Sequence, residues 1–515
     1  MTQMTAIKRN KKEYGDWQTP QDFALRVCDF LKENKGVKPS LVIEPTCGKG
    51  SFVKGSLIFG ADEIIGIEIN PEYCSSCREE IQDERVKIVN ADFFSFDLNA
   101  LAKGREPLLV VGNPPWATNS ELSRILSDNL PVKANFKGLS GLAAMTGESN
   151  FDIAEYMILR TLSALNGWHS TVAMLCKTSV ARNVFRELKR TNIDFSLCEV
   201  YEFDAGKVFG VNASACLLVV ELGGEKNERD VCDVYSLDEP SKCKGSFGFV
   251  DGVFYSNTRT ASTQIAGRCC FNWRQGVKHD CASVMELKAT DGGLVNGLGE
   301  KVEIERDCVF PLVKSSMFKN PIINEFKKYV IVTQRHINED TRHIALDAPK
   351  TWSYLATHES LFAKRKSSIY KNAPRFAMFG VGDYSFAPYK VGVSGFYKKP
   401  LFCLLSSEDT PVMVDDTSYF LSFSTFNEAY AAMLLLNTQI VQDFLLSATF
   451  LDAKRPFTKK VLEQIDFGKI LRVVGEEDLN ETERLLGLES QFKPDMLLAL
   501  ENAAGRKQTE LDLFN

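Results

Sequence analysis

Four short apolar runs, each ending at or just before an acid or an amide, constrain the fold of this chain more than any other feature. The runs are Leu41–Glu44, Glu63–Glu68, Val86–Asp92 and Leu108–Val111. Such runs are typical of buried parallel strands, and helix-length stretches separate them. Strands that alternate with helices predict a doubly wound α/β sheet, whose ligands bind at the carboxyl ends of the strands. We therefore expect Glu44, Glu68, Asp92 and Asn113 at one edge of one sheet.

The residues around these strand ends are suited to holding a nucleoside. The loop Pro45–Phe52 contains two glycines, and glycine lets the backbone approach a ligand closely. An acid at the end of the second strand, here Glu68, commonly accepts hydrogen bonds from ribose hydroxyls. Asp92 can accept a hydrogen bond from an adenine amine, and Ile69 and Phe93 can pack on that ring.

The tetrapeptide Asn113-Pro114-Pro115-Trp116 follows the fourth strand. The side-chain oxygen of Asn113 can accept a hydrogen bond from an amino group, and the carbonyl of Pro114 can accept a second. Proline stiffens this backbone, and Trp116 can lie flat on a planar base. The arrangement suits a flipped-out adenine whose exocyclic amine is alkylated. A proline-stiffened turn after a buried strand is the alternative for the tetrapeptide taken alone.

Taken in order, these motifs resemble the gamma class of DNA adenine-N6 methyltransferases, the TaqI-like group. Gly15–Pro20 resembles the N-terminal motif of that family, which helps to hold the methionine end of S-adenosylmethionine. Val208–Ala215 resembles the motif whose aromatic residue, here Phe209, helps to hold the target base. Trp116 stands where Tyr or Phe is more usual, and it is still a stacking ring. The resemblance covers residues 1–225 well and the rest more loosely.

The resemblance implies a Rossmann-like class I methyltransferase domain followed by a mixed α/β target-recognition region. It implies transfer of a methyl group from S-adenosylmethionine to adenine N6 in double-stranded DNA after base flipping, within or derived from a restriction-modification system. The implied catalytic residues are Asn113, Pro114, Pro115, Trp116 and Phe209. The implied cofactor-binding residues are Gln18, Thr19, Glu44, Pro45, Cys47, Gly48, Gly50, Glu68, Ile69, Asp92, Phe93 and Asn113. We expect no metal, because the five histidines are scattered and no Cys/His cluster has ligand spacing.

Other functions remain open on the sequence alone. An Asn-Pro-Pro-aromatic motif also serves RNA and protein-glutamine methyltransferases, and modification subunits that need a partner chain. A catalytically inactive DNA-binding module is the alternative from a different class. The long C-terminal region and the net charge of −6 argue against an RNA enzyme, and the complete set of strand-end acids argues against an inactive module.

Length and composition fit a multidomain enzyme. A chain of 515 residues implies two or three domains. We place a methyltransferase domain at 1–225, a target-recognition region at 226–500 and a flexible tail at 501–515. Fourteen irregularly spaced cysteines without a signal peptide favour reduced thiols and a cytoplasmic location, and no apolar run is long enough to cross a membrane.

A basic and aromatic window at 351–400 is the candidate DNA-binding surface. Eight Lys and Arg against two acids give this window a net charge of +6, which suits contact with phosphates. The candidate contacts are Arg365, Lys366, Lys371 and Arg375. Arg274, Lys278 and His279 can also face DNA, or can merely cap a turn. The alternative for the window is a set of core aromatics beneath solvated lysines.

The end of the chain matches a short peptide by which bacterial proteins bind the replicative sliding clamp. Gln508, Leu511, Leu513 and Phe514 supply the pattern. An extended tail would place the three apolar side chains in a groove, with Gln508 setting the register. A last helical turn folded back on the domain is the alternative. We see no room for an endonuclease domain, so any restriction endonuclease is expected on a separate chain.

Overall fold

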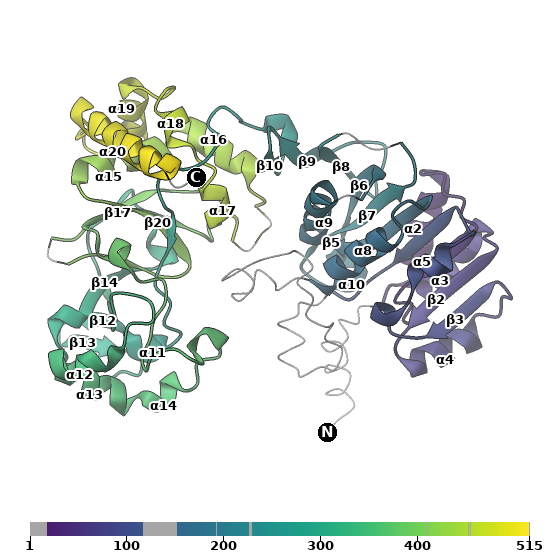
Figure 1. Cartoon of the computed structure of the whole chain (residues 1–515), viewed down its shortest axis with the longest axis horizontal. Helices are drawn as coiled ribbons and strands as arrows, with labels where there is room; N and C mark the ends of the chain where they lie inside the picture. The colour runs from purple at the N-terminus through teal and green to yellow at the C-terminus, as the bar shows by residue number, and fades with distance from the viewer. Residues whose placement is uncertain are drawn as a thin grey trace. The chain divides into compact units, whose positions relative to one another are not determined.

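The computed structural model describes residues 18–116, 152–191, 193–225, 229–408, 410–451, 453 and 455–513. These residues form two compact units (Figure 1). The first comprises the described residues up to Val250 together with Asn257–Arg259, and the second comprises Asp251–Ser256 and the described residues from Thr260. The first unit therefore extends beyond the boundary that we expected at residue 225.

The sheet of the first unit is built from parallel strands that are extended on one side by antiparallel ones. Within the first unit, its strand order is β9-β8-β6-β7-β5-β4-β1-β2-β3. The strands are β1 (Leu41–Glu44), β2 (Glu63–Glu68), β3 (Val86–Asn90), β4 (Leu108–Gly112), β5 (Ser170–Lys177), β6 (Phe195–Asp204), β7 (Ser214–Leu222), β8 (Val231–Ser236) and β9 (Gly245–Val250). Strands β1 to β5 pair in parallel, whereas β7 is antiparallel to both β5 and β6. The predicted α/β class is confirmed.

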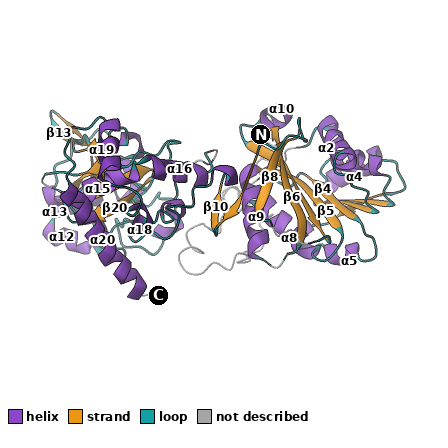
Figure 2. Ribbon diagram, turned by 90° about the horizontal axis from the view of Figure 1, so that it is seen from above, coloured by secondary structure: helices purple, strands orange, loops and turns teal. Residues whose placement is uncertain are grey.

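Helices cover both faces of this sheet, with α2 and α4 on one side and α5 and α8 on the other (Figure 2). The helices are α2 (Gln21–Glu33), α3 (Ser51–Ser56), α4 (Pro71–Glu80), α5 (Leu98–Ala102), α8 (Ile153–Ala164), α9 (Thr178–Arg190) and α10 (Ala205–Phe209). Polar caps start several of them. The side chain of Asn70 accepts from the N–H of Glu72 at α4, and that of Asp152 accepts from the N–H of Ala154 at α8.

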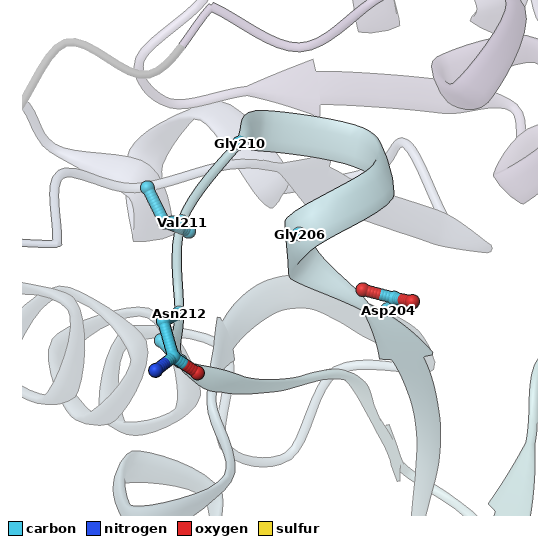
Figure 3. Close-up of a pocket in the computed structure, with 6 residues that line it drawn as sticks. Asp204, Gly206, Gly210, Val211 and Asn212 are labelled. Carbon is cyan, nitrogen blue, oxygen red and sulfur yellow. The ribbon is translucent and has the colours of Figure 1, made fainter.

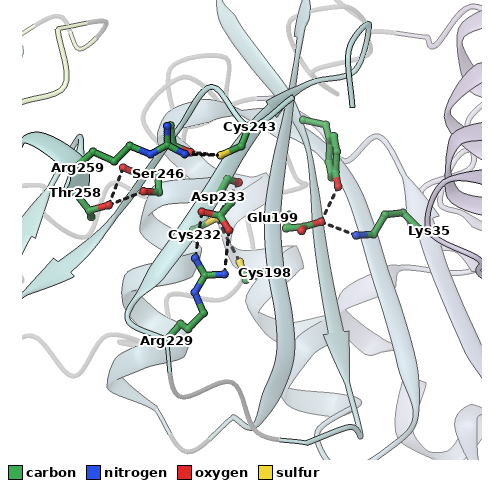
Figure 4. A network of polar contacts seen from close by, with 12 residues as sticks. Lys35, Cys198, Glu199, Arg229, Cys232, Asp233, Cys243, Ser246, Thr258 and Arg259 are labelled. Atoms are coloured by element: carbon green, nitrogen blue, oxygen red, sulfur yellow. Dashed lines mark hydrogen bonds and ion pairs between the residues drawn. The ribbon is translucent and has the colours of Figure 1, made fainter. Parts of the chain in front are cut away.

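Strands β8 and β9 carry the first unit past residue 225. Strand β8 pairs in parallel with β6, and β9 pairs with β8. Polar contacts fasten this extension (Figure 4). Lys244, just before β9, lies 3.3 Å from Glu202 on β6, and Ser246 on β9 bonds to Thr258. The chain after the expected linker thus returns to the same sheet before it enters the second unit.

Strand register brings the functional strand ends together. Glu44 is level with Gly66 of β2, and Glu68 is level with Asn90 of β3. On the other side of β1, Ile43 is level with Val110 of β4. Because these strands are parallel, their carboxyl ends share one edge of the sheet.

The second unit contains two five-stranded sheets among its described residues. One has the order β11-β20-β17-β18-β15, with β11 (Arg274–Gln275), β20 (Ser418–Phe423), β17 (Tyr389–Ser394), β18 (Cys403–Leu405) and β15 (Ile322–Ile323). The other has the order β13-β12-β16-β14-β19, with β13 (Gly293–Asn296), β12 (Glu286–Thr290), β16 (Lys328–Ile331), β14 (Val309–Val313) and β19 (Met413–Val414). Strand β10 (Val253–Tyr255) opens this unit and contacts α16.

Helices complete the second unit. They are α11 (Ala282–Met285), α12 (Ile344–Asp347), α13 (Pro349–Thr357), α14 (Glu359–Phe362), α15 (Phe426–Leu436), α16 (Gln439–Ala448), α17 (Lys459–Leu462), α18 (Phe467–Ile470), α19 (Glu476–Leu485) and α20 (Pro494–Leu513). No single described helix is long and apolar enough to cross a membrane. Helices α15 and α16 pass that test only as a pair bent by 60°.

The expectation of a flexible tail at 501–515 is wrong for the described part of that segment. Residues up to Leu513 belong to α20. Leu500, Ala503 and Ala504 are buried, and Arg506 lies 3.3 Å from Glu428 of α15. The segment is rich in residues with high helix propensity, and its packing against α15 stabilises a helix in place of an extended tail.

Candidate active site

The glycine loop after β1 is anchored by two buried acids. Glu44 is 3% exposed, and its carboxylate accepts a hydrogen bond from the N–H of Val53 at 2.8 Å. Burial raises the pKa of Glu44 well above its usual value. The side chain of Glu44 therefore holds the start of α3 in place from within the sheet.

Glu68 ties the same loop to the end of β2. One carboxylate oxygen accepts from the N–H of Gly48 and the other from the N–H of Asn70, both at 2.8 Å. Gly48 has a φ of +51°, and a Cβ added there would lie 2.8 Å from Oε1 of Gln18. Only glycine fits this position without a shift of Gln18.

The segment before α2 joins the glycine loop to the tetrapeptide. The side-chain oxygen of Gln18 accepts from the N–H of Lys49 at 3.1 Å. The hydroxyl of Thr19 lies 3.3 Å from Nδ2 of Asn113, which donates to it, and the carbonyl of Thr19 accepts from Ser51 at 2.7 Å. Gln18 and Thr19, predicted as cofactor-binding residues, thus lie between the loop and Asn113.

The next strand ends present the residues expected around an adenine ring. Ile69 is 44% exposed, whereas Phe93 is buried with its ring 5.6 Å from that of Phe94. Asp92 is exposed and accepts from the N–H of Phe94 at 2.9 Å. Asn90 donates to the carbonyl oxygens of Glu68 and Ile69, which fixes the backbone of β2 where these residues leave the sheet.

The structure brings the two aromatic residues predicted for the target base together. The rings of Trp116 and Phe209 meet edge to face, with centroids 5.4 Å apart and planes at 72°. Trp116 is 8% exposed, and Phe209 also packs near Phe23 and Phe203. Residues 93 apart in sequence therefore form one aromatic wall beside Asn113.

The residues that follow Phe209 in the sequence line a hollow of about 370 Å³ (Figure 3). The turn from α10 to β7 lines it, with Asp204, Gly206, Gly210, Val211, Asn212 and Ala213. Asp204 caps α10 by accepting from the N–H of Lys207 at 3.1 Å. The lining is largely backbone and small side chains, so the hollow borders the aromatic wall with polar groups.

An ion pair at the same edge was missed by sequence reasoning. Lys177, the last residue of β5, lies 2.7 Å from Asp152, whose side chain is 10% exposed. Met174 of β5 is level with Gly112 at the end of β4. Strand β5 continues for three more residues, so Lys177 lies beyond the end of β4. Burial raises the pKa of Asp152, against the opposing effect of Lys177. The sequence shows that Asp152 can cap a helix and that Lys177 can end a strand. It does not show that the two side chains meet.

The cysteines near this edge contact the glycine loop, and we identify no metal site among the described residues. The thiol of Cys77 on α4 donates to the carbonyl of Gly48 at 3.2 Å, and Cys47 is buried in the same loop. Within the described ranges, no three His, Cys, Asp or Glu side chains gather as metal ligands.

The predicted DNA contacts in the second unit differ in environment. Arg365 donates to the carbonyl of Ala377 at 2.7 Å and lies over the Tyr370 ring at 3.9 Å. Arg375 pairs with Glu359 and lies over aromatic rings. Lys366 and Lys371 are exposed. Arg365 therefore takes part in the internal structure, whereas Arg375, in its surface ion pair, and the two lysines are exposed to solvent.

Together, the sheet and its glycine-loop edge define the class I methyltransferase architecture. No family model matches the chain. It is 39% identical over 478 residues to the type II methyltransferase M.NspV of Nostoc sp., a match that spans 91% of this chain and 99% of that relative. The chain belongs to the type II methyltransferase family, and S-adenosylmethionine is its cofactor.

Two further comparisons bear on the two parts of the chain. The type IIL restriction-modification enzyme MmeI, solved in complex with DNA, superposes with a TM-score of 0.51 at 12% identity. That match covers 99% of this chain and 79% of MmeI, so the fold is shared across both units. A ribosomal RNA small subunit methyltransferase A of Acidobacterium capsulatum is 37% identical over 115 residues, which cover 22% of this chain and 40% of that relative.

The residues at this edge fit the cofactor. At Gly48 the φ of +51° favours glycine, and a Cβ there would displace the end of the Gln18 side chain, so glycine keeps the loop backbone open to a ligand. Exposed Ile69 and Asp92 stand at neighbouring strand ends and offer an apolar surface and an acceptor. This combination matches the needs of an adenosine group.

Proposed function

We propose that this enzyme methylates adenine N6 in double-stranded DNA after flipping the adenine out of the helix. The observation that carries the proposal is the position of Asn113–Trp116. This segment ends β4 beside the glycine loop, with Trp116 against Phe209. Membership of the gamma class would account for this arrangement, and the 39% identity to a type II methyltransferase supports a place in a restriction-modification system.

In the proposed reaction, the tetrapeptide holds the adenine amine. The side-chain oxygen of Asn113 and the carbonyl of Pro114 each accept one amine hydrogen, which draws the nitrogen lone pair out of conjugation. Trp116 and Phe209 hold the base by ring contact, and Pro115 stiffens the turn. When bound, S-adenosylmethionine supplies an activated methyl group. Holding the amine in line with that methyl lowers the barrier through positioning, and the surplus amine proton passes to solvent.

The cofactor contacts divide into two roles under this proposal. Ile69, Asp92 and Phe93 surround the adenine, and Glu68 accepts from the ribose. Gln18, Thr19, Pro45, Cys47, Gly48, Gly50 and Asn113 surround the methionine end, while Glu44 acts through the loop that it anchors.

In this proposal the second unit is the target-recognition region, which we expected at residues 226–500. Its exposed Lys366 and Lys371 contribute phosphate contacts. A cognate restriction endonuclease, where one exists, is a separate chain.

Nucleoside mass spectrometry on plasmid DNA incubated with the protein and S-adenosylmethionine tests the reaction. We expect N6-methyladenine with the intact protein and none above background with Asn113→Ala. Asn480→Ala, an exposed position on α19, should behave as wild type. Cofactor binding without methylated adenine would favour an RNA or protein-glutamine substrate, or a missing partner chain. Absence of cofactor binding would favour an inactive DNA-binding module.

We also propose that the end of α20 binds the replicative sliding clamp. Leu513 is 78% exposed although it is apolar, and Gln508 is held in the helix by Asp512 at 2.9 Å. Binding in an extended form requires the last turns of α20 to unwind; Phe514 lies outside the described residues. A peptide of residues 501–515 should bind purified clamp at micromolar concentration, and Leu513→Ala should abolish binding. No binding at high micromolar peptide would contradict the proposal.

A further inference from the structure

The turn between β19 and β20 is a meeting point of segments that are far apart in sequence. The carbonyl of Asp416 accepts from the side chains of Gln275 and Arg455. The backbone of Gly276 donates to Ser418 at 3.2 Å, and that of Val277 donates to Val414 at 2.7 Å. Segments around residues 275, 416 and 455 therefore share one surface of the second unit.

Two further segments join this surface. Lys278 exchanges backbone hydrogen bonds with Phe379, both at 2.8 Å, and the Tyr370 hydroxyl donates to the carbonyl of Lys278 at 3.2 Å. On the other side, Gly395 donates to the carbonyl of Thr417 at 3.1 Å. The loop that carries residues 395–399 is thus attached to the turn itself, and the loop that carries residues 366–371 is attached to the neighbouring segment at Lys278.

Cations outnumber acids among the charged side chains that these segments leave at least partly exposed. The cations are Lys278, Lys366, Lys371, Lys398, Lys399 and Arg455. Several cations on one surface attract a polyanion, and a DNA backbone releases counterions when they bind its phosphates. Charge complementarity therefore favours a DNA duplex as the occupant.

Two acids also lie at least partly exposed on this cationic surface. Asp280 lies 3.7 Å from Lys278, whereas Asp416 is half-buried, and among the described residues no hydrogen-bond donor or ion-pair partner contacts its carboxylate. Burial and neighbouring Asp415 raise the pKa of Asp416, against the opposing effects of Lys278 and Arg455. Asp415, by contrast, accepts from Thr417 and Ser418 and so holds the turn. The fold uses the carboxylate of Asp415 but makes no hydrogen bond to that of Asp416.

An unused acid on a phosphate-binding surface weakens binding to DNA unless it contacts something other than phosphate. A carboxylate only accepts hydrogen bonds. In the major groove, the partners that match it are the amino groups of cytosine and adenine, whereas guanine and thymine edges present acceptors. The chemistry of Asp416 therefore corresponds to base readout.

We propose that Asp416 is a specificity-determining residue that accepts a hydrogen bond from a base amino group in the major groove. The surrounding cations contact the phosphates and position it. This inference rests on the proposed function, because it requires DNA as the substrate.

Mapping methylated adenines in a plasmid library of diverse sequence tests the inference. The wild-type protein should mark one recognition sequence. Asp416→Asn, which keeps the shape and loses the charge, should relax that sequence at one base pair, with discrimination reduced about 10- to 100-fold. S-adenosylmethionine affinity and the unfolding midpoint should stay unchanged. Asp495→Asn at the exposed start of α20 is the matched control and should leave the sequence unchanged.

The outcomes separate the inference from the function on which it rests. If the wild type methylates DNA and Asp416→Asn retains the same sequence at every position, the base-reading role is overturned while the function stands. If the wild type methylates no DNA, both are overturned. Should Asp416→Asn unfold at lower temperature than wild type, Asp416→Glu supplies the test, because it keeps the charge and displaces the acceptor. The same relaxation supports the inference, and an unchanged sequence overturns it.

Discussion

At the carboxyl edge of the first sheet, buried acids bond to the backbone of their own or the neighbouring strand-loop unit, whereas around Asp416 side chains from distant segments meet. Glu68 and the Gly48 N–H to which it bonds are 20 residues apart. Gln275 and the Asp416 carbonyl that it contacts are 141 apart. The first site is therefore assembled by repeated β-loop-α units, and the second by the tertiary fold of a whole domain.

The two units also differ in how they bury charge. In the first, Glu44 receives a backbone N–H, and Asp152 receives both a backbone N–H and a lysine. In the second, Lys390 is fully buried on β17, and among the described residues its one acceptor is the carbonyl of Ala387, at 2.8 Å. Glu44 and Asp152 thus each receive a backbone hydrogen bond, whereas the buried ammonium group of Lys390 has, in the described part of the chain, a neutral acceptor and no acid. This contrast leads to the largest effect that we expect.

Replacing Lys390 by methionine should stabilise the second unit at acid and neutral pH. Burial lowers the pKa of Lys390 to about 7, below its value in the unfolded chain. Protonation therefore costs stability below pH 7, and that cost disappears as pH rises from 7 toward 10.5. Lys390→Met should raise the free energy of unfolding by about 1–4 kcal/mol at pH 6 and flatten its rise with pH. Urea unfolding at pH 6 and 9 measures this effect.

Exposed Lys399 supplies the matched control for that change. Lys399→Met should alter the unfolding free energy by less than about 0.5 kcal/mol at either pH. Equal stability of wild type and Lys390→Met at pH 6 would mean that water or structural relaxation reaches the ammonium group, and that the two units bury charge alike.

At the cofactor edge, Glu68→Ala should weaken S-adenosylmethionine binding about 10- to 100-fold. The change removes a charged acceptor from the N–H groups of Gly48 and Asn70, and such bonds contribute about 1.5–3 kcal/mol each. Isothermal titration calorimetry measures the affinity. Glu72→Ala, at an exposed position in the first turn of α4, serves as control. An unchanged affinity for Glu68→Ala would show that the glycine loop keeps its shape without this acid.

The difference between the two regions also explains what could be predicted. The order of strand ends, the glycine loop and the tetrapeptide are local patterns, and parallel pairing alone brings Glu44, Glu68 and Asn113 to one edge. The role of Phe209 at the target base is implied only by the resemblance to a family, and its contact with Trp116 could not be predicted, because strands β5 to β7 must be placed before the two rings can meet.

Other features depended on packing that composition does not reveal. Arg365 lies in a basic and aromatic window, yet its guanidinium is stacked on Tyr370 and bonded within the domain. The tail segment has polar residues at a chain end, yet its small apolar face packs on α15. In each case the contact depends on how the chain folds back on itself, which local charge or polarity does not reveal.

The ion pair missed at the cofactor edge should contribute both stability and activity. Lys177→Met leaves the carboxylate of Asp152 without its cation, and it should destabilise the first unit by about 2 kcal/mol. Methyl transfer should fall with it, because Asp152 caps α8 at the edge that carries Asn113. The double variant Asp152→Asn/Lys177→Met should recover part of the stability, with a coupling energy of about 1–3 kcal/mol.

Thermal unfolding of the single and double variants measures this coupling. Lys207→Met is the control, because Lys207 is 85% exposed and lies 4.0 Å from Asp204, where an ion pair contributes little. Strict additivity of the two single changes would mean that Asp152 and Lys177 act independently. Backbone hydrogen bonds alone would then hold the carboxyl edge of the first sheet in place.

The smallest effects should separate the two kinds of cation in the second unit. Arg365→Met removes internal hydrogen bonds and ring contacts, so it should lower stability by about 1–2 kcal/mol. Lys371→Met removes an exposed charge, so the free energy of unfolding should change by less than about 0.5 kcal/mol. The affinity for DNA should fall, and the slope of log affinity against log salt should decrease by about 1. Fluorescence anisotropy with a labelled duplex at several salt concentrations measures the slope. An unchanged slope for Lys371→Met would mean that other residues contact the phosphates. A reduced slope for Arg365→Met at unchanged stability would mean that Arg365 leaves its internal partners and binds DNA.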